Sequence, residues 1–518
     1  MSALVAFLRS IATVGGWTMG SRVLGFARDI LIAGILGAGP VADAFFVAFK
    51  FPNFFRRLFA EGAFNAAFVP QFAGTLQAEG LDAARRLAEA TQAVLLSVLL
   101  PFVLLAQAGM PWLMVLIAPG FVGEAEKFAL AVELTRLTFP YLMFMALVAL
   151  MGGVLNSLER FQAAAAAPIV LNIVLIGALV WLGDAFATPG HALAWGVAAA
   201  GAAQFLLLVL ACRGAGVALA LPRPRLTPQV RKLLRLMLPG AIGAGVVQIN
   251  LVIDVILAST LPVGSISFLY YADRVNQLPL GVVGVAVGIA LLPLLSRQLR
   301  AGDTAAAHNS QNRAIELSLL LTVPAAAALI AIAGPIVTVL FERGAFDQTS
   351  SVATARALTA FALGLPAYVL IKALGPGFFA REDTATPVKI AAAAMIFNIA
   401  AALVLMQFLA HVGIALATAL SAWINAGALA FLLHRRGFLV PDARLKRRLP
   451  GIVISAALMA AALWFAAGWL AATLEGPLLV KAVALAALVA GGMALFAALA
   501  LATGAARLSE LRRMLARG

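Results

Sequence analysis

The sequence lacks the residue patterns that support catalysis, disulfides or metal clusters. A single cysteine, Cys212, among 518 residues excludes an internal disulfide and a cysteine-ligated metal cluster. The four histidines lie at loops or at the ends of apolar runs, with neither HExxH nor another metal-ligand spacing. The glycine-containing stretch GPGFFARED (375–383) has no following Lys-Ser/Thr and is no phosphate-binding P-loop. We therefore expect no enzyme and no bound organic cofactor.

Charge is also scarce, which points to a membrane protein. Only 11% of the residues are charged and 63% are hydrophobic, with a mean hydropathy of +1.02, whereas a soluble domain has about 25% charged residues. No removable signal peptide is evident, because Arg22 and Arg28 interrupt the first apolar stretch. The net charge of +15 does not indicate a nucleic-acid partner, because the basic residues recur in short loops at regular intervals.

The apolar runs predict an all-α integral membrane protein with about fourteen transmembrane helices, since about 20 apolar residues cross a bilayer. Several runs exceed that length, so tilted or kinked helices are expected. The expected spans are 10–36, 41–75, 88–118, 128–157, 164–183, 191–213, 229–260, 265–298, 310–341, 350–380, 386–410, 411–434, 449–472 and 478–502.

Loop charges predict the orientation. Cytoplasmic loops of membrane proteins are enriched in Lys and Arg. Alternate connections here are basic and the intervening ones are poor in basic residues, with Lys127 and Arg343 as mild exceptions, so both termini are expected in the cytoplasm. The basic connections carry Arg85 and Arg86, Arg160, Arg213 through Arg235, Arg297 and Arg300, Arg381 and Lys389, and Arg435 through Arg448.

A weak internal repeat predicts two similar lobes. VLIAPGF (115–121) followed by RLTFPYL (136–142) resembles VLFERGAF (339–346) followed by a proline-containing helix at 357–370. Six spans separate the copies, which makes the repeat parallel and favours two six-helix lobes around a central cavity. Chance similarity between Leu/Ala-rich helices is the alternative. The expected domains are a first lobe at 1–213, a cytoplasmic linker at 214–228, a second lobe at 229–434, and a loop, two accessory spans and a tail at 435–518.

One stretch, residues 21–61, is unusually rich in charge for a pair of membrane helices. A charge at the bilayer centre costs roughly 2.5–3.5 kcal/mol on insertion scales, so a water-filled cavity between helices is the favoured interpretation; anchoring at the interface is the alternative. Helical phase supports a cavity, and Pro52 is expected to kink the second helix. The charged residues are Arg22, Arg28, Asp29, Asp43, Lys50, Arg56, Arg57 and Glu61.

The span at 265–298 supplies a second charged pair, Asp273 and Arg274. One interpretation is a self-neutralised pair near the span end. The other places Arg274 with Arg22, Arg28 and Arg56 in a single anion site. Arginine suits a diphosphate because its planar fork donates paired hydrogen bonds and keeps its charge when desolvated.

Several motifs resemble the MurJ (MviN) family of lipid II flippases, members of the multidrug/oligosaccharidyl-lipid/polysaccharide exporter superfamily. SRVLGFARD, ADAFFVAFKFPN and FRRLFAEGAFNAAFVP resemble its first two helices, and YYADRVNQLP and TPVKIA match further along. The resemblance implies that the four arginines bind the diphosphate, with Asp43 and Asp273 as further cavity residues. Family members often carry Glu where this chain has Gln277, which puts a carboxylate role there in doubt. The accessory spans are similar to a pair that forms a groove open to lipid.

The same resemblance implies a coupling ion. Some members of the family bind sodium, and the matching positions are Asp254, Asn398 and Thr418, with backbone help near Ile414. Oxygen ligands suit a hard cation. However, a second acid expected beyond Asn398 is Ala402 here, so a protonated or hydrogen-bonded Asp254 is the alternative.

The favoured function is therefore transport. We expect a multi-pass, monomeric protein of the bacterial cytoplasmic (inner) membrane that flips lipid II, an undecaprenyl-diphosphate-linked disaccharide-pentapeptide, by alternating access. The substrate would enter between the first and eighth spans. A related exporter of drugs or other oligosaccharide-lipids is the first alternative. A membrane enzyme acting on polyprenyl diphosphates is the second, although its clustered acids or nucleophile are missing. Apart from lipid II, only membrane lipids are expected as partners.

Overall fold

The structure is a computed structural model that describes residues 2–56 and 64–507; side chains are described except at 2–14, 238–249 and five positions between 282 and 289. Every regular element in this part of the chain is helical, and an isolated bridge pairs Arg343 with Phe346. The chain forms two compact units, Met1–Ser267 and Phe268–Gly518. This division falls beyond the linker expected at 214–228, and the six-helix lobe boundaries stay a prediction.

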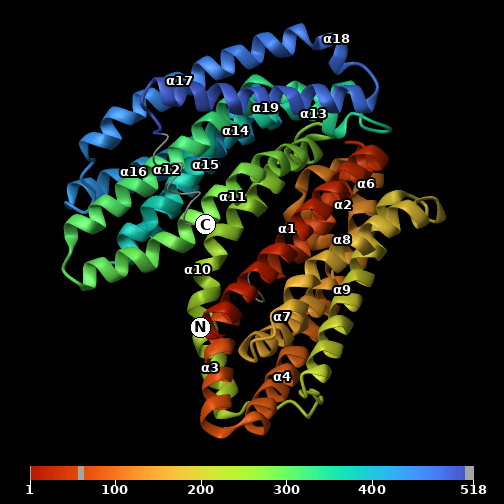
Figure 1. Ribbon diagram of the computed structural model, residues 1–518. Helices are drawn as coiled ribbons and strands as arrows, with labels where there is room; N and C mark the ends of the chain where they lie inside the picture. Colours follow the sequence, from red (N-terminus) through yellow and green to blue (C-terminus); the bar gives the residue numbers. More distant parts are fainter. Residues whose placement is uncertain (1, 57–63, 508–518) are drawn as a thin grey trace. The chain divides into compact units, whose positions relative to one another are not determined.

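Unit 1 is built from ten α-helices and two short 3₁₀ turns among the described residues (Figure 1). Figure 1 shows α8 and α9 running beside one another within it, as their packing confirms. The helices are α1 (Ser2–Leu36), α2 (Pro40–Phe55), α3 (Phe64–Glu79), α4 (Leu81–Ala108), α5 (Met110–Ile117), α6 (Ala125–Thr138), α7 (Tyr141–Ser157), α8 (Gln162–Leu182), α9 (Pro189–Gly214) and α10 (Pro228–Ser259), with η2 (Pro119–Gly123) and η3 (Gly183–Ala185).

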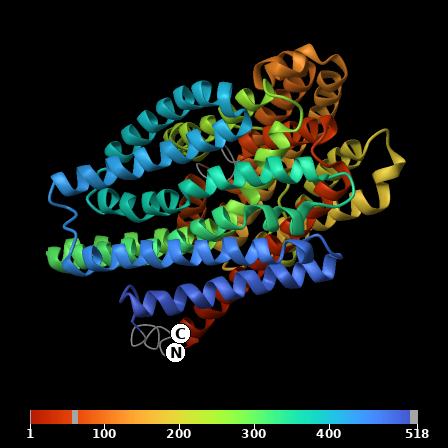
Figure 2. The same cartoon turned by 90° about the horizontal axis from the view of Figure 1, so that it is seen from above.

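Unit 2 begins inside α11. Its last long helices, α17 and α19 (blue), run side by side in both views (Figures 1 and 2). The helices are α11 (Ser265–Arg300), α12 (Thr304–Ala331), α13 (Ala333–Phe341), α14 (Gln348–Phe379), α15 (Ala385–Leu409), α16 (His411–Arg435), α17 (Ala443–Trp469), α18 (Ala471–Leu474) and α19 (Leu478–Ala502).

Ten helical segments in the described part of the chain are long and apolar enough to cross a membrane. They coincide with ten of the expected spans, which confirms a multi-pass helical protein. The other four expected spans are the ones that carry the intramembrane charges discussed above or contain undescribed side chains, so the count of fourteen stays a prediction. These four are 10–36, 41–75, 229–260 and 265–298.

The two units share an order of elements, which supports the parallel repeat. In unit 1, α4 of 28 residues ends at Ala108, is capped by Gly109 and is followed by the short α5; in unit 2, α12 of 28 residues is followed by the short α13. Pro111 and Pro335 lie in the first turns of the two short helices, where a missing backbone N–H costs little. The expected spans 88–118 and 310–341 are therefore each broken into two helices.

The prolines in the later motif of the repeat, Pro140 in unit 1 and Pro366 in unit 2, affect their helices differently. Pro140 separates α6 from α7, whereas Pro366 lies inside the continuous α14. A proline removes one helical hydrogen bond wherever it stands, but neighbouring helices can compensate for the loss. The expected span 128–157 is therefore two helices, and the expected span 350–380 is one.

Each unit has its own apolar packing. In unit 1, α1 packs on α8, and α2 packs on α6 and α9. In unit 2, α14 packs on α12 and α16, and α17 joins α12 to α19. A core cluster that includes Val287, Ile315, Phe378 and Ile452 links α11, α12, α14 and α17. The terminal helices are thus part of the core of unit 2.

Candidate functional site

Arg28 lies on α1, and its guanidinium is buried among polar partners. Its Nε and Nη2 donate to Oδ1 of Asp29 at 3.0 and 2.7 Å, and its Nη1 donates to Oδ1 of Asn172 at 3.0 Å. The guanidinium also faces the Phe49 ring at 5.7 Å. Burial of a charge is tolerated only when it is paired and hydrogen-bonded, and here one carboxylate and one amide fulfil that condition.

Asn172 of α8 ties this arrangement to the backbone of α1. Its Nδ2 donates to the Ser21 carbonyl at 3.0 Å, and its amide lies 3.5 Å from the place where a Cβ at Gly25 would stand. A Cβ at Gly25 would therefore make only an ordinary van der Waals contact with Asn172. Asn172 was not among the predicted site residues, although a lone Asn in the apolar run PIVLNIVLIG is a signal that could have identified it.

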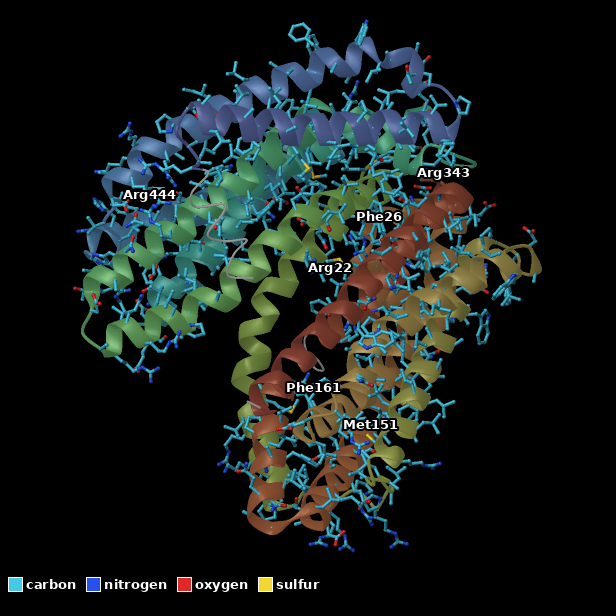
Figure 3. The ribbon with its side chains drawn as sticks, in the orientation of Figure 1. Arg22, Phe26, Met151, Phe161, Arg343 and Arg444 are labelled. Carbon is cyan, nitrogen blue, oxygen red and sulfur yellow. The ribbon has the colours of Figure 1, made fainter. Side chains whose placement is uncertain are left out.

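The other two arginines of unit 1 differ in exposure. Arg22, one turn from Phe26 on α1, is exposed (Figure 3). Arg56 is half-buried at the end of α2, and its Nε donates to Oδ1 of Asn53 at 2.9 Å. The structure thus places an exposed, a buried and a half-buried guanidinium on the two helices that the sequence singled out.

Pro52 lies inside α2, as expected, and a neighbour compensates for it. A proline at this position leaves the carbonyl of Ala48 without its helical donor. The hydroxyl of Thr138 on α6 donates to that carbonyl at 2.7 Å. The helix continues through Pro52 to Phe55. The hydrogen bond that the Ala48 carbonyl loses within α2 is therefore replaced by one from α6.

Asp43 is buried and holds the start of α11. Its carboxylate accepts hydrogen bonds from the backbone N–H groups of Gly264 and Ser267 at 2.8 and 3.0 Å, and from the Ser267 hydroxyl at 2.7 Å. The ammonium of Lys127 lies 3.3 Å from the same carboxylate and 4.2 Å from the centre of the Phe121 ring. A carboxylate at a helix N-terminus is favoured by the unpaired N–H groups and the helix dipole.

The remaining predicted residues of this stretch are placed only in part. Lys50 is half-buried on α2. Arg57 and Glu61 lie outside the described residues. Lys127 is buried although the sequence treated it as a loop residue, and no local pattern distinguishes it from an exposed loop lysine.

In unit 2, the predicted residues of α11 form a local set. Arg274 donates from Nη2 to the Tyr270 hydroxyl at 2.9 Å and faces that ring at 4.9 Å. The Gln277 amide donates to the Asp273 carboxylate, so glutamine fulfils a hydrogen-bonding role at this position. Convergence of Arg274 with the arginines of unit 1 stays a prediction.

The proposed ion ligands of unit 2 lie at one level of a helix pair. The Ser421 hydroxyl of α16 donates to the Ala394 carbonyl of α15 at 2.7 Å, which fixes the register of the two helices. Asn398 lies one turn beyond Ala394, and Thr418 lies one turn before Ser421. Thr418 Oγ1 donates to the Ile414 carbonyl at 3.0 Å. Asp254 belongs to unit 1, and the complete set of ligands stays a prediction.

These observations define the class of protein. Apolar spanning helices in two compact units, with arginines held by polar contacts within the helices, define a multi-pass helical membrane protein. The fold agrees with solved structures. "Lipid II flippase MurJ, inward closed conformation" matches with a TM-score of 0.76 at 23% identity, covering 94% of this chain and 98% of that one. An inward-facing MATE-family transporter of the MOP superfamily matches with a TM-score of 0.67 at 15% identity, over 82% and 95%.

Sequence comparison gives the family. The model of the family described as "Lipid II flippase MurJ" matches residues 32–483. The "Probable lipid II flippase MurJ" of Rhizobium meliloti (strain 1021) is 49% identical over 99% of this chain and 97% of the relative. The "Lipid II flippase MurJ" of Burkholderia cenocepacia is 36% identical over 87% of this chain and 88% of the relative. The chain belongs to the lipid II flippase MurJ family.

Proposed function

We propose that this protein moves lipid II from the inner to the outer leaflet of the bacterial cytoplasmic membrane by alternating access, for peptidoglycan synthesis. Family membership and the intramembrane arginines support the proposal. The basic loops support a cytoplasmic location for both termini. The protein acts as a monomer in this scheme, with membrane lipids as its surroundings. Because the sequence has no nucleotide-binding motif, the energy comes from an ion gradient or the membrane potential.

The arrangement around Arg28 carries the proposal. Its planar guanidinium is oriented on one side by Asn172 and presents Nε and Nη2 together to the Asp29 carboxylate. A phosphate oxygen accepts the same paired hydrogen bonds as a carboxylate. Asp29 therefore occupies the position of an anionic substrate group and neutralises Arg28 until a diphosphate replaces it.

The other charged residues extend this site. Arg22 is exposed and Arg56 is half-buried, so both can meet a hydrated head group. Arg274 is the contribution of unit 2, held by Tyr270. In this scheme the other predicted residues, all of them charged except Gln277, line or gate the path of the head group. They are Asp29, Asp43, Lys50, Arg57, Glu61, Asp273 and Gln277.

Sodium is the coupling ion of the proposal. The amide oxygen of Asn398 and the hydroxyl of Thr418 stand at one level of α15 and α16 and fit the preference of a hard cation for oxygen. Asp254 would add the negative charge. The sodium dependence of flipping should be weaker in Asp254→Ala than in wild type, and identical sodium titrations would remove this ion from the scheme.

Drug exporters share the fold and are the second candidate. A transporter of cationic drugs needs acidic groups that face its substrate. Here the central acid on α1, Asp29, is already bound to Arg28, and the arginines outnumber the acids in the proposed site. This excess of guanidinium favours an anionic lipid substrate.

The test compares three variants in cells that depend on this protein for cell-wall synthesis. Arg28→Ala should abolish growth because the diphosphate loses the oriented guanidinium that binds it through paired hydrogen bonds. Arg28→Lys should restore little, because lysine cannot donate paired hydrogen bonds from one plane. Arg86→Ala removes an exposed arginine near the start of α4 and should be silent.

Membrane insertion of each variant is measured in parallel, together with the exposure of labelled lipid II on the outer membrane face. Normal growth and normal lipid II exposure in Arg28→Ala would refute the anion site. Chemical conversion of the labelled lipid by purified protein would refute transport.

A further inference from the structure

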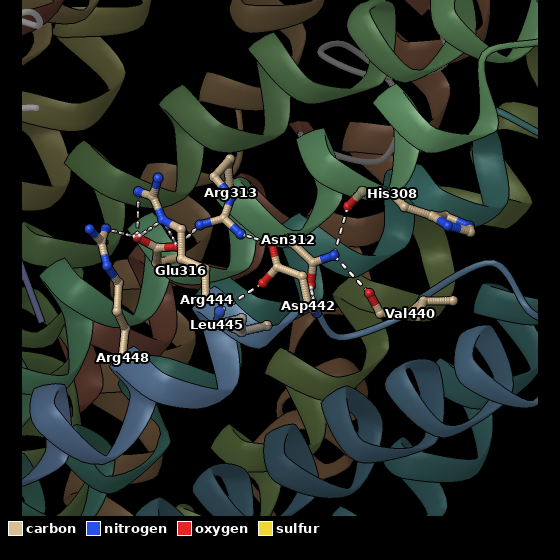
Figure 4. A network of polar contacts seen from close by, with 9 residues as sticks. All are labelled: His308, Asn312, Arg313, Glu316, Val440, Asp442, Arg444, Leu445 and Arg448. Carbon is tan, nitrogen blue, oxygen red and sulfur yellow. Dashed lines mark hydrogen bonds and ion pairs between the residues drawn. The ribbon is translucent and has the colours of Figure 1, made fainter.

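A buried acid on α12, Glu316, binds arginines from two helices (Figure 4). Arg444 of α17 donates from Nη2 to Oε1 at 2.9 Å and from Nε to Oε2 at 3.1 Å. Arg448, one turn further along α17, donates to Oε1, and Arg313 of α12 donates to Oε2. A single carboxylate therefore joins the first turns of α17 to α12.

A second set of contacts lies beside the first. Arg313 also pairs with Asp442, whose Oδ1 accepts from the backbone N–H of Leu445 at 2.7 Å and caps α17. The Asn312 amide donates to the carbonyls of His308 and Val440 at 2.9 and 2.8 Å. The segment that leads into α17 is thus held to α12 by both side-chain and backbone bonds (Figure 4).

The members of this network differ in burial, which identifies its critical pair. The side chains of Glu316 and Arg448 are each 6% exposed, whereas Arg444 is 42% exposed. An exposed ion pair contributes little to stability, but a buried charge that loses its partner is costly. Glu316 and Arg448 are therefore the members whose separation matters.

Beyond this network, the terminal helices α17 and α19 make apolar contacts with the described part of the unit. Near the network, Ile452 and Ala500 enter the apolar core, and Ser455 bonds to Thr503 within the pair at 3.1 Å. At the far end, Trp464 and Trp469 are 63% and 89% exposed, and α18 and α19 touch α13. In lipid, helices associate through close packing and interhelical hydrogen bonds rather than through a hydrophobic force, so polar contacts contribute to fixing their orientation.

We propose that Glu316 is a positioning residue that fastens α17 and α19 to the rest of unit 2, so that the pair moves with unit 2 as one body during transport. The network stands at one end of α17 and sets its register and rotation against α12. The inference rests on the proposed function, because a unit that rocks in the membrane must carry its lipid-facing helices with it.

The experiment uses a double variant, Glu316→Leu with Arg448→Met. Replacing a buried ion pair by apolar side chains of similar volume is often neutral for stability, whereas removing one partner is not. Arg313 keeps Asp442, and the half-exposed Arg444 is solvated by water. The double variant should therefore melt close to wild type, while the single variant Glu316→Gln should melt well below it.

Two readouts then separate positioning from stability. Spin labels at Leu479 on α19 and Val352 on α14, both exposed in unit 2, report the distance between the pair and the unit in a Cys212→Ala background. Flipping of fluorescent lipid II in proteoliposomes reports transport. In the double variant we expect a broadened distance distribution and a severalfold lower flipping rate.

The matched control is Asp383→Asn, which alters an ion pair with Arg436 on the same unit whose side chains are 25% and 40% exposed. It should leave both readouts unchanged. A sharp, unshifted distance in the stable double variant overturns the proposal, and so does a broadened distance with normal flipping. Failure of the double variant to fold also overturns it, because the network would then serve stability rather than positioning. The distance readout needs no flipping, so it decides even if the proposed substrate is wrong.

Discussion

Asp43 in unit 1 and Glu316 in unit 2 are both buried acids that connect helices, but they do so with different partners. Asp43 accepts from two backbone N–H groups and a hydroxyl, and one lysine pairs with it. Glu316 is surrounded by three guanidiniums, one of which is 42% exposed. We call each set of contacts a joint. The joint at Asp43 is made mostly of peptide groups, and the joint at Glu316 is made of long arginine side chains.

The difference teaches how each joint responds to change. Backbone donors cannot move without moving the helix, so the geometry around Asp43 is fixed by the turn between α10 and α11. That turn is itself held closely, because a Cβ at Gly120 would stand 2.0 Å from the Ser259 carbonyl oxygen. Arginine side chains can rotate and reach water, so the joint at Glu316 adapts more easily.

The largest expected effect follows from removing the charge of Asp43. Asp43→Asn leaves the buried Lys127 ammonium beside a neutral amide, with the carboxylate of Glu124 further away at 3.8 Å, and offers an N–H group where an acceptor is needed. We expect a loss of about 3–5 kcal/mol in the free energy of unfolding. Thermal unfolding of the purified protein measures it.

Asp303→Asn is the control for this change. Asp303 is an exposed cap that accepts from the Ala306 N–H at 2.8 Å, and asparagine caps helices about as well as aspartate. Equal melting of the Asp43 and Asp303 variants would show that the buried joint is not the stronger one.

A smaller effect is expected from salt. Between about 0.1 and 1 M salt the screening length falls from about 10 to 3 Å. The stability difference between wild type and Glu316→Gln should shrink by about 0.2–1 kcal/mol, because the Arg444 and Arg313 partners of Glu316 are partly exposed. The difference for Asp43→Asn should stay constant, because the Asp43–Lys127 pair is shielded from the solvent. The measurement is the melting midpoint of all three proteins across the salt series. If salt changes the melting midpoints of the two variants equally, the two joints do not differ in their response to salt.

The smallest effect concerns a partly exposed acid, Asp383, in the loop before α15. Hydrogen bonds from the Thr386 hydroxyl and backbone N–H, and then from Arg436, lower its pKa to about 2. A lowered pKa stabilises the folded state above the unfolded pKa of about 3.9 and ceases to do so as pH falls toward the folded value. The melting midpoints of wild type and Asp383→Asn should therefore differ slightly near neutral pH and converge below about pH 3. A difference that persists at the lowest pH would assign it to something other than ionisation.

Much of the fold could be predicted from the sequence. Ten of the expected spans coincide with helices able to cross a membrane, because apolar runs of sufficient length have no other stable arrangement in lipid. The breaks at Gly109 and before Ala333 were not predicted. Hydrophobicity alone does not distinguish an apolar run that forms one helix from a run that forms two. The break becomes visible in the structure, where the short helices α5 and α13 follow the long ones.

The candidate site could be predicted only in its charged residues. Arg28 and Asp43 stood out because charge inside an apolar run is costly. Their partners did not stand out: Asn172 is 144 residues from Arg28, and Lys127 and Glu316 sit in segments that read as ordinary span ends. Contacts between residues that distant are set by helix packing, which a local pattern does not encode.

The sequence by itself determined that the chain crosses a membrane many times and that guanidinium groups sit within its helices, since both follow from the cost of moving each residue out of water. The tertiary structure decided which acid, amide or peptide group meets each of those charges, and hence that Asp43 holds a helix start while Glu316 holds the terminal helices. Those pairings depend on the register and rotation of packed helices. Many similar sequences could adopt other registers, and only the close packing of the whole unit selects one.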